Sequence, residues 1–154
     1  MCIRDRISGG SSTIGGAVNL LWAGETGSRQ VFSFDATTTP GSIYLNVVGS
    51  PPATLVWSGT NGSAWDTSTV NWLNAGAADK FYNFDSVVYD DASTNGNVVI
   101  SGIVQPTQVV VTNSILNYTL GGGVLGGAAE LVKNGSATLY SVSYTHLDVY
   151  KRQA

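Results

Sequence analysis

Charged residues are scarce in this sequence of 154 residues. They make up 11% of the chain, whereas globular proteins average about a quarter. Residues 7–141 hold only three cations, Arg29, Lys80 and Lys133, against eight acids, which gives this segment a net charge of −5. Recognition of nucleic acid depends on clustered Lys and Arg side chains, so these sparse cations argue against a nucleic-acid partner.

Cysteine and histidine are almost absent as well. The only cysteine is Cys2 and the only histidine is His146, so residues 7–141 contain neither. Thiol chemistry, a zinc site and a histidine-based catalytic triad are therefore excluded within that segment. Adjacent acids such as Asp90 and Asp91 would point to opposite faces of a strand, which leaves them unsuited to paired acid–base chemistry. We expect this segment to be neither an enzyme nor a cofactor-binding protein.

Long apolar runs are missing too. Residues 36–65 and 92–129 carry no charge, but Asn, Thr, Ser, Gln, Pro and Gly interrupt both stretches throughout. No window of the sequence has the pattern of a membrane-spanning helix. With 43% hydrophobic residues, the chain still has enough apolar surface to bury the core of one domain.

Both ends of the sequence look foreign to the rest. Asp148–Gln153 can be encoded by GAT GTG TAT AAG AGA CAG, and the same letters read one nucleotide later encode Met1–Arg6. The reverse complement of this DNA, with one more base at each junction, encodes Ser141–Leu147. This short DNA word resembles the transposase mosaic end used in sequencing libraries. We therefore expect residues 1–6 and 142–154 to be translated adapter that contributes nothing specific to the core.

Short runs of β-branched and aromatic residues recur along the chain, separated by turn signals such as Asn61-Gly62, Asn95-Gly96 and Asn134-Gly135. Such runs are typical of strands, and no window has a convincing helical period. We therefore predict an all-β fold, with a boundary at Gly49-Ser-Pro-Pro52. The predicted strands are Gln30–Phe34, Ser42–Val48, Thr54–Trp57, Ser86–Tyr89, Asn97–Ser101, Gln108–Asn113, Asn117–Leu120, Glu130–Asn134 and Ala137–Ser141.

The second half of the chain contains an internal near-repeat with a period of about twenty residues. Val98–Gly102 aligns with Tyr118–Gly122, and Val111–Asn113 aligns with Val132–Asn134. Two short strands in each period are what one coil of a β-solenoid requires, because equivalent side chains then stack in columns. A β-sandwich is the alternative that the turn spacing also permits. The expected columns are Ile100 with Leu120 and Leu139, Val111 with Val132, and Asn113 with Asn134.

A family resemblance covers residues 54–141. The run Trp57–Thr67, followed by Asn71–Asn74 and Phe84–Asp91, resembles the repeat unit of autotransporter-associated β-strand proteins, also called passenger-associated transport repeats. The closing segment Glu130–Leu139 resembles that family's L-x-K-x-G-x-x-T-L signature.

The resemblance implies a right-handed parallel β-helix whose first coil is irregular and rich in aromatic residues. It further implies a structural segment of a secreted or surface-displayed bacterial protein, with a stalk, passenger, adhesion or export-assisting role and with adjacent repeats of the same protein as partners. Residues 7–53 are then the end of a preceding unit. Membrane association would require a translocator or anchor that this sequence does not contain. A carbohydrate-binding module, or a non-catalytic part of a carbohydrate-active enzyme, is the alternative function.

Two motifs in the chain resemble ligand-binding loops. Gly121–Gly126 satisfies G-x-G-x-x-G, but a further strand follows instead of a helix, so we interpret it as a turn and not as a dinucleotide site. Asp91–Asn97 has the alternating oxygen side chains of a calcium loop, but Gly102 stands where the bidentate carboxylate would be. The candidates for a weak calcium site are Asp90, Asp91 and Asn95, and an Asp-rich turn is the alternative.

A set of aromatic residues is concentrated between Trp57 and Phe84. Exposed rings would provide stacking surfaces for surface glycans, with Trp65, Trp72 and Tyr82 as the candidates, whereas buried rings would form the core of the first coil. The family resemblance favours burial.

Overall fold

The computed structural model describes residues 27–35 and 42–141, and all regular secondary structure in these ranges is β-strand. The predicted all-β class is therefore confirmed. The described residues contain no helix long and apolar enough to cross a membrane. The adapter-like segments 1–6 and 142–154 lie outside the described residues. The chain divides into two compact units between Pro51 and Pro52.

The first unit contains a β-hairpin. Strand β1 (Gln30–Asp35) pairs antiparallel with β2 (Tyr44–Gly49). Val31 lies opposite Val48, and both side chains are exposed. Together they give the hairpin a small apolar patch.

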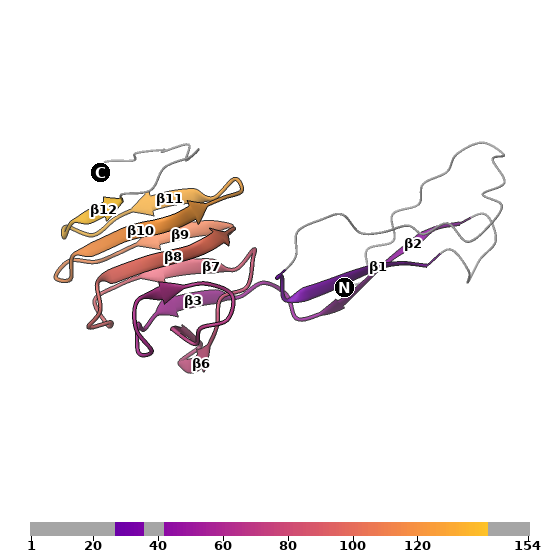
Figure 1. Cartoon of the computed structure of the whole chain (residues 1–154), viewed down its shortest axis with the longest axis horizontal. Helices are drawn as coiled ribbons and strands as arrows, with labels where there is room; N and C mark the ends of the chain where they lie inside the picture. Colours follow the sequence, from indigo (N-terminus) through magenta and orange to yellow (C-terminus); the bar gives the residue numbers. More distant parts are fainter. Residues whose placement is uncertain (1–26, 36–41, 142–154) are drawn as a thin grey trace. The chain divides into compact units, whose positions relative to one another are not determined.

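The second unit contains two sheets (Figure 1). Four strands form one sheet in the order β12-β10-β8-β4, and all neighbours in it are parallel. The other sheet has six strands in the order β11-β9-β7-β3-β5-β6, in which β5 and β6 are antiparallel to their neighbours and the rest are parallel. The strands are β3 (Thr54–Trp57), β4 (Ala64–Trp65), β5 (Trp72–Asn74), β6 (Ala77–Asp79), β7 (Ser86–Tyr89), β8 (Asn97–Val104), β9 (Gln108–Val111), β10 (Tyr118–Leu125), β11 (Glu130–Lys133) and β12 (Leu139–Ser141).

From β7 onward, successive strands belong alternately to the two sheets. Strands β7, β9 and β11 lie in the six-stranded sheet, while β8, β10 and β12 lie in the four-stranded sheet. Each strand therefore pairs with the strand two places further along the chain. In Figure 1 these strands lie one above the other in order of sequence. We call one strand of each sheet, taken together, a layer: β3 with β4, β7 with β8, β9 with β10, and β11 with β12. The first layer, β3 with β4, also includes the added strands β5 and β6. The expected parallel pairing of these strands is present.

The register differs from the expected one. Gln108 is the partner of both Ser86 and Glu130, so the period is two residues longer than the expected twenty. Ile100 consequently lies beside Gly122, and Leu120 lies beside Val98.

The three expected columns are therefore wrong. Leu139 lies beside Tyr118. Val111 lies beside Lys133, while Val132 lies beside Val110 on the opposite face of the sheet. The amide of Ala137 bonds to the carbonyl of Asn113, so Asn134 does not stack on Asn113 as expected. Aligning similar apolar residues in the sequence does not reveal how many residues each corner between two strands requires. A one-residue error in the alignment moves a side chain to the other face of the sheet.

Every predicted strand range contains a strand, but three strands escaped prediction. Strands β4, β5 and β6 are only two or three residues long, which is too short for a period to be visible. Strands β8 and β10 also extend beyond their predicted ends, through Gly102 and through Gly121–Gly123.

The interpretation of Gly121–Gly126 as a turn is wrong. Most of this segment lies in β10, where the register against β8 shifts by one residue between Gly122 and Val124. A Cβ on Gly123 would lie 2.2 Å from the carbonyl oxygen of Gly102. Glycine is needed because two backbones approach closely at a β-bulge.

Gly122 and Gly62 offer a matched test of this close approach. Both have a left-handed φ, but an added Cβ at Gly62 meets nothing within 4 Å, while at Gly122 it would lie 2.4 Å from the carbonyl oxygen of Ile100. We expect Gly62→Ala to lower the free energy of unfolding by about 1 kcal/mol through the backbone alone. Gly122→Ala should cost roughly 1–3 kcal/mol more, because β10 must shift. Denaturant unfolding measures both values, and equal losses would contradict the close packing.

Candidate functional site

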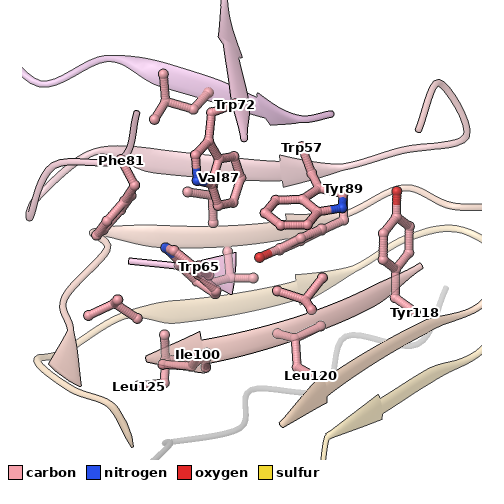
Figure 2. Close-up of a cluster of buried hydrophobic side chains, with 14 of the residues drawn as sticks. Trp57, Trp65, Trp72, Phe81, Val87, Tyr89, Ile100, Tyr118, Leu120 and Leu125 are labelled. Carbon is pink, nitrogen blue, oxygen red and sulfur yellow. The ribbon is translucent and has the colours of Figure 1, made fainter. Parts of the chain in front are cut away.

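The largest buried side chains of the second unit form one aromatic cluster between the two sheets (Figure 2). Both sheets contribute rings, and every ring in the cluster is fully buried. The members are Trp57 of β3, Trp65 of β4, Trp72 of β5, Phe81, Tyr89 of β7 and Tyr118 of β10. The cluster therefore unites the short strands β4 and β5, which have little main-chain pairing of their own, with the long parallel strands.

The rings meet mostly edge to face. The centroids of Trp57 and Trp72 are 5.0 Å apart at 75°, and those of Trp65 and Phe81 are 5.5 Å apart at 88°. Tyr89 lies 5.6 Å from Trp72 at 63°. This arrangement places the positive edge of one ring against the negative face of another, and each such pair adds about 0.5–1.5 kcal/mol to the burial of apolar surface.

The polar atoms of the cluster are only partly satisfied. Trp57 Nε1 donates to the carbonyl of Asn95 at 2.8 Å, and the Tyr118 hydroxyl donates to the carbonyl of Asp90 at 2.6 Å. Trp65 Nε1, Trp72 Nε1 and the Tyr89 hydroxyl are buried with no hydrogen-bond partner among the described residues. Burial raises the pKa of Tyr89 well above its ordinary range and that of Tyr118 to about 12. Both phenols are therefore neutral at physiological pH.

The glycan-stacking candidates are not brought together on a surface. Trp65 and Trp72 have no exposed surface, so neither can offer a ring face to a sugar. Tyr82 is half-buried, with Lys80 Nζ 4.9 Å from its ring centroid. Trp65 of β4 and Trp72 of β5 are buried because their rings fill the space between the two sheets.

The calcium candidates lie at one corner but serve separate structural contacts. Asp90 Oδ1 accepts the amide of Ala92 at 3.0 Å, and Asn95 Nδ2 donates to the carbonyl of Gly62 at 3.0 Å. The carboxylate of Asp91 instead faces the next layer. The residues that the structure describes include no group of three or more His, Cys, Asp or Glu side chains that could hold a metal ion.

Asp91 binds three consecutive backbone amides of the next layer. Its carboxylate accepts from Ser114 at 2.8 and 3.1 Å, from Ile115 at 3.0 Å and from Leu116 at 2.9 Å. The amides of Leu116, Ile115 and Ser114 lower the pKa of Asp91, and the positive charge of Lys133 adds to the effect. The carboxylate thus acts as a staple between layers.

Amide side chains make similar links at neighbouring corners. Asn113 Nδ2 donates to the carbonyl of Thr138 at 3.2 Å, and Asn117 Oδ1 accepts the amide of Thr138 at 2.8 Å. In the first layer, Asn71 is fully buried, accepts the amide of Asn61 and donates to the carbonyl of Ala64. Asp85 is also fully buried and accepts the amides of Ala53 and Tyr82.

The sequence predicted a link between layers for Asn113, with Asn134 as the wrong partner, and no linking role for Asn71, Asp85, Asp91 or Asn117. Asn71 and Asp85 stand inside the segments that carry the family resemblance, and that was the only signal that could have drawn attention to them. These polar side chains therefore bond main-chain groups at the corners of the second unit, some of them buried and others exposed.

Comparisons with known proteins returned no match to this chain from family models, curated protein sequences or solved structures.

Replacing a buried or a half-exposed aromatic side chain should lower the free energy of unfolding by different amounts. Trp72→Ala should lower the free energy of unfolding by about 3–5 kcal/mol, because it opens a cavity between the sheets. Tyr82→Ala, which removes a half-exposed ring, should cost about 1 kcal/mol or less. Denaturant unfolding followed by tryptophan fluorescence measures both changes, and a similar cost for the two variants would contradict the burial pattern.

The Asp91 staple should make stability depend on pH. The pKa of Asp91 in the folded protein lies below its ordinary value of 3.8. Its contribution is therefore present above that value and is lost as the pH falls through the folded-state pKa. Asp91→Asn should lower the thermal unfolding midpoint at pH 7, and the difference from the wild type should shrink below pH 3.8.

Asp90→Asn is the matched control, because the Asp90 carboxylate accepts an amide of its own turn and not of the next layer. Its midpoint should change less than that of Asp91→Asn. Equal losses for the two variants at pH 7 would show that Asp91 does not link the layers.

Proposed function

We propose that residues 54–141 are a structural β-solenoid repeat segment of a secreted or surface-displayed bacterial protein. In this role the segment is part of a stalk or passenger scaffold, and its contribution is length and rigidity. Adhesion or assistance during export would be further roles of the whole protein. Adjacent repeats of the same protein are the expected partners.

The constant spacing of parallel partners is the observation that carries this proposal. Strands β7, β9 and β11 pair at one constant offset, that of Ser86 to Gln108 and of Gln108 to Glu130. Strands β8, β10 and β12 pair at the same offset or at one residue less. A chain that repeats one layer in this way extends along one axis, with each layer contacting only its neighbours. A sandwich built from hairpins would pair consecutive strands, whereas from β7 onward consecutive strands lie in opposite sheets.

The first layer supports the resemblance to autotransporter-associated β-strand repeats. Thr54 of β3 pairs with Ser86 of β7 at a longer offset than in the later layers, because this layer also contains β5 and β6. The tryptophans that carry the resemblance, Trp57, Trp65 and Trp72, all lie in its buried cluster. An irregular, aromatic-rich first coil followed by regular ones matches the expectation from the family. A right-handed path is the expected one for parallel strands joined by crossovers.

A structural role also accounts for how the carboxylates are used. Asp66, Asp85 and Asp91 all accept backbone amides. Asp66 does so within the first layer, whereas Asp85 and Asp91 each accept an amide of a neighbouring layer. Carboxylates engaged in this way stabilise turns and are poor general bases. We therefore propose that the segment is not itself an enzyme. Of the three candidate residues for a carbohydrate-binding module, only Tyr82 keeps exposed surface, since Trp65 and Trp72 are buried.

Duplicating one layer tests the solenoid directly. Residues 98–119 span one period, because Val98 and Leu120 are partners in neighbouring layers. A second copy of this segment inserted after Thr119 should add a layer in register. The variant should unfold cooperatively, and the denaturant dependence of its unfolding free energy should rise by about a fifth with the added buried surface.

Duplicating residues 98–108 is the matched control. This shorter insertion is half a period, so it would send each later strand to the wrong sheet. It should abolish cooperative unfolding. If the full-period insertion is equally disruptive, the layers are not interchangeable and the solenoid proposal fails.

A further inference from the structure

One inward-facing column of side chains crosses all six strands of the larger sheet. Strand pairing places Asp79 beside Trp72, Trp72 beside Trp57, and Tyr89 beside Val111, which in turn lies beside Lys133. Trp57 joins Tyr89 because the β3–β7 register continues by one residue and their ring centroids are 6.0 Å apart. In strand order the column is Asp79 (β6), Trp72 (β5), Trp57 (β3), Tyr89 (β7), Val111 (β9) and Lys133 (β11).

The two ends of this column carry opposite charges. The four middle residues are fully buried, whereas Asp79 and Lys133 are half-buried. Strands β6 and β11 are the outermost strands of their sheet within the described residues. A charge that points inward on an edge strand opposes indiscriminate pairing, because a neutral strand added there would bury the charge unpaired.

The two edges also run in the same direction. Strand β5 is antiparallel to β3, and β6 is antiparallel to β5, so β6 runs parallel to β3 and hence to β11. The β11 edge of one copy could therefore add to the β6 edge of another and continue the parallel ladder. With Lys133 opposite Asp79, the half-buried Leu131 would lie opposite Ala77, which is exposed and small.

We propose that copies of this protein associate end to end, with β11 of one copy pairing in parallel with β6 of the next and Lys133 forming an ion pair with Asp79 across the joint. Charge complementarity in the inward column selects this occupant, because a parallel joint of two β11 edges in the same register would place Lys133 against Lys133, and a joint of two β6 edges would place Asp79 against Asp79. The contact is heterologous and need not close, so it produces linear assemblies. This inference rests on the strand order, the register and the charges at the two edges, and it applies where no adjacent repeat covers β6 or β11.

Contacts already made by the two side chains are compatible with the joint. Asp79 accepts from Asn74 Nδ2 at 3.1 Å and from the amide of Lys80 at 2.8 Å. The ammonium of Lys133 donates to the carbonyl of Gly135. A carboxylate has about four acceptor positions and an ammonium has three donors, so each group can add the interchain contact.

Charge exchange between the two edges tests the proposal with the chain of 154 residues. Sedimentation velocity over a concentration series should show wild-type assemblies that dissociate as salt is raised, because part of the attraction is electrostatic. Lys133→Asp and Asp79→Lys should each raise the concentration needed for assembly about tenfold or more, since each places like charges across the joint.

Restoring complementarity should then restore assembly. In an equimolar mixture of the two single variants, the aspartate introduced in β11 of one chain meets the lysine introduced in β6 of the other. The native Lys133 of the second chain likewise meets the native Asp79 of the first. We expect this mixture, and the double variant with both charges exchanged, to assemble at about the wild-type concentration. Thermal unfolding of each variant checks that the fold is intact.

Three outcomes would overturn the inference. A wild-type chain that stays monomeric at all concentrations would do so, as would assembly that is unchanged in both single variants. Failure of both the mixture and the double variant to assemble, with folded single variants, would show that the charges do not meet. None of these results bears on the layer-duplication experiment, which tests the solenoid within a single chain.

Discussion

The buried aromatic cluster is the interaction on which the second unit depends. Strands β4, β5 and β6 are two or three residues long and could not persist by main-chain pairing alone. Trp65 and Trp72 attach the first two of them to the rings of β3 and β7, and the edge-to-face geometry fixes how they sit. This layer presents one strand edge in each sheet. Strands β7 and β8 pair with these edges, and β9 and β10 then pair with β7 and β8.

Corner residues set how the later layers follow one another. A parallel ladder by itself tolerates slippage, but the carboxylate of Asp91 fits only against the three amides that begin at Ser114. Asn113 and Asn117 repeat the device one layer further along, toward Thr138. Close glycine contacts, such as that of Gly123 with Gly102, add a steric condition on the same register. Polar side chains and glycines here specify alignment, while the apolar residues supply most of the burial.

The proposed roles follow from this construction. A protein built from equal layers gains length at little cost in new topology, which suits a scaffold or stalk better than a catalyst. Its weakness is that both sheets of such a stack end in open edges, which are exposed to pairing. Opposite charges at Asp79 and Lys133 would make the pairing of these edges selective. A β11 edge would pair with a β6 edge, because pairing two like edges in the same register would bury like charges.

The sequence by itself determined the all-β class, the main strands and the repetition of two strands per period, because β-branched runs and turn dipeptides are local signals. The buried fate of the tryptophans could be expected only from the family resemblance. Tertiary structure decided the true length of the period, the strands β4 to β6, the strand role of Gly121–Gly123 and the linking role of Asp91. These features depend on which residues lie side by side in neighbouring layers. Bulges and corner lengths set that alignment, and neither can be recognised from the short run of residues around each strand.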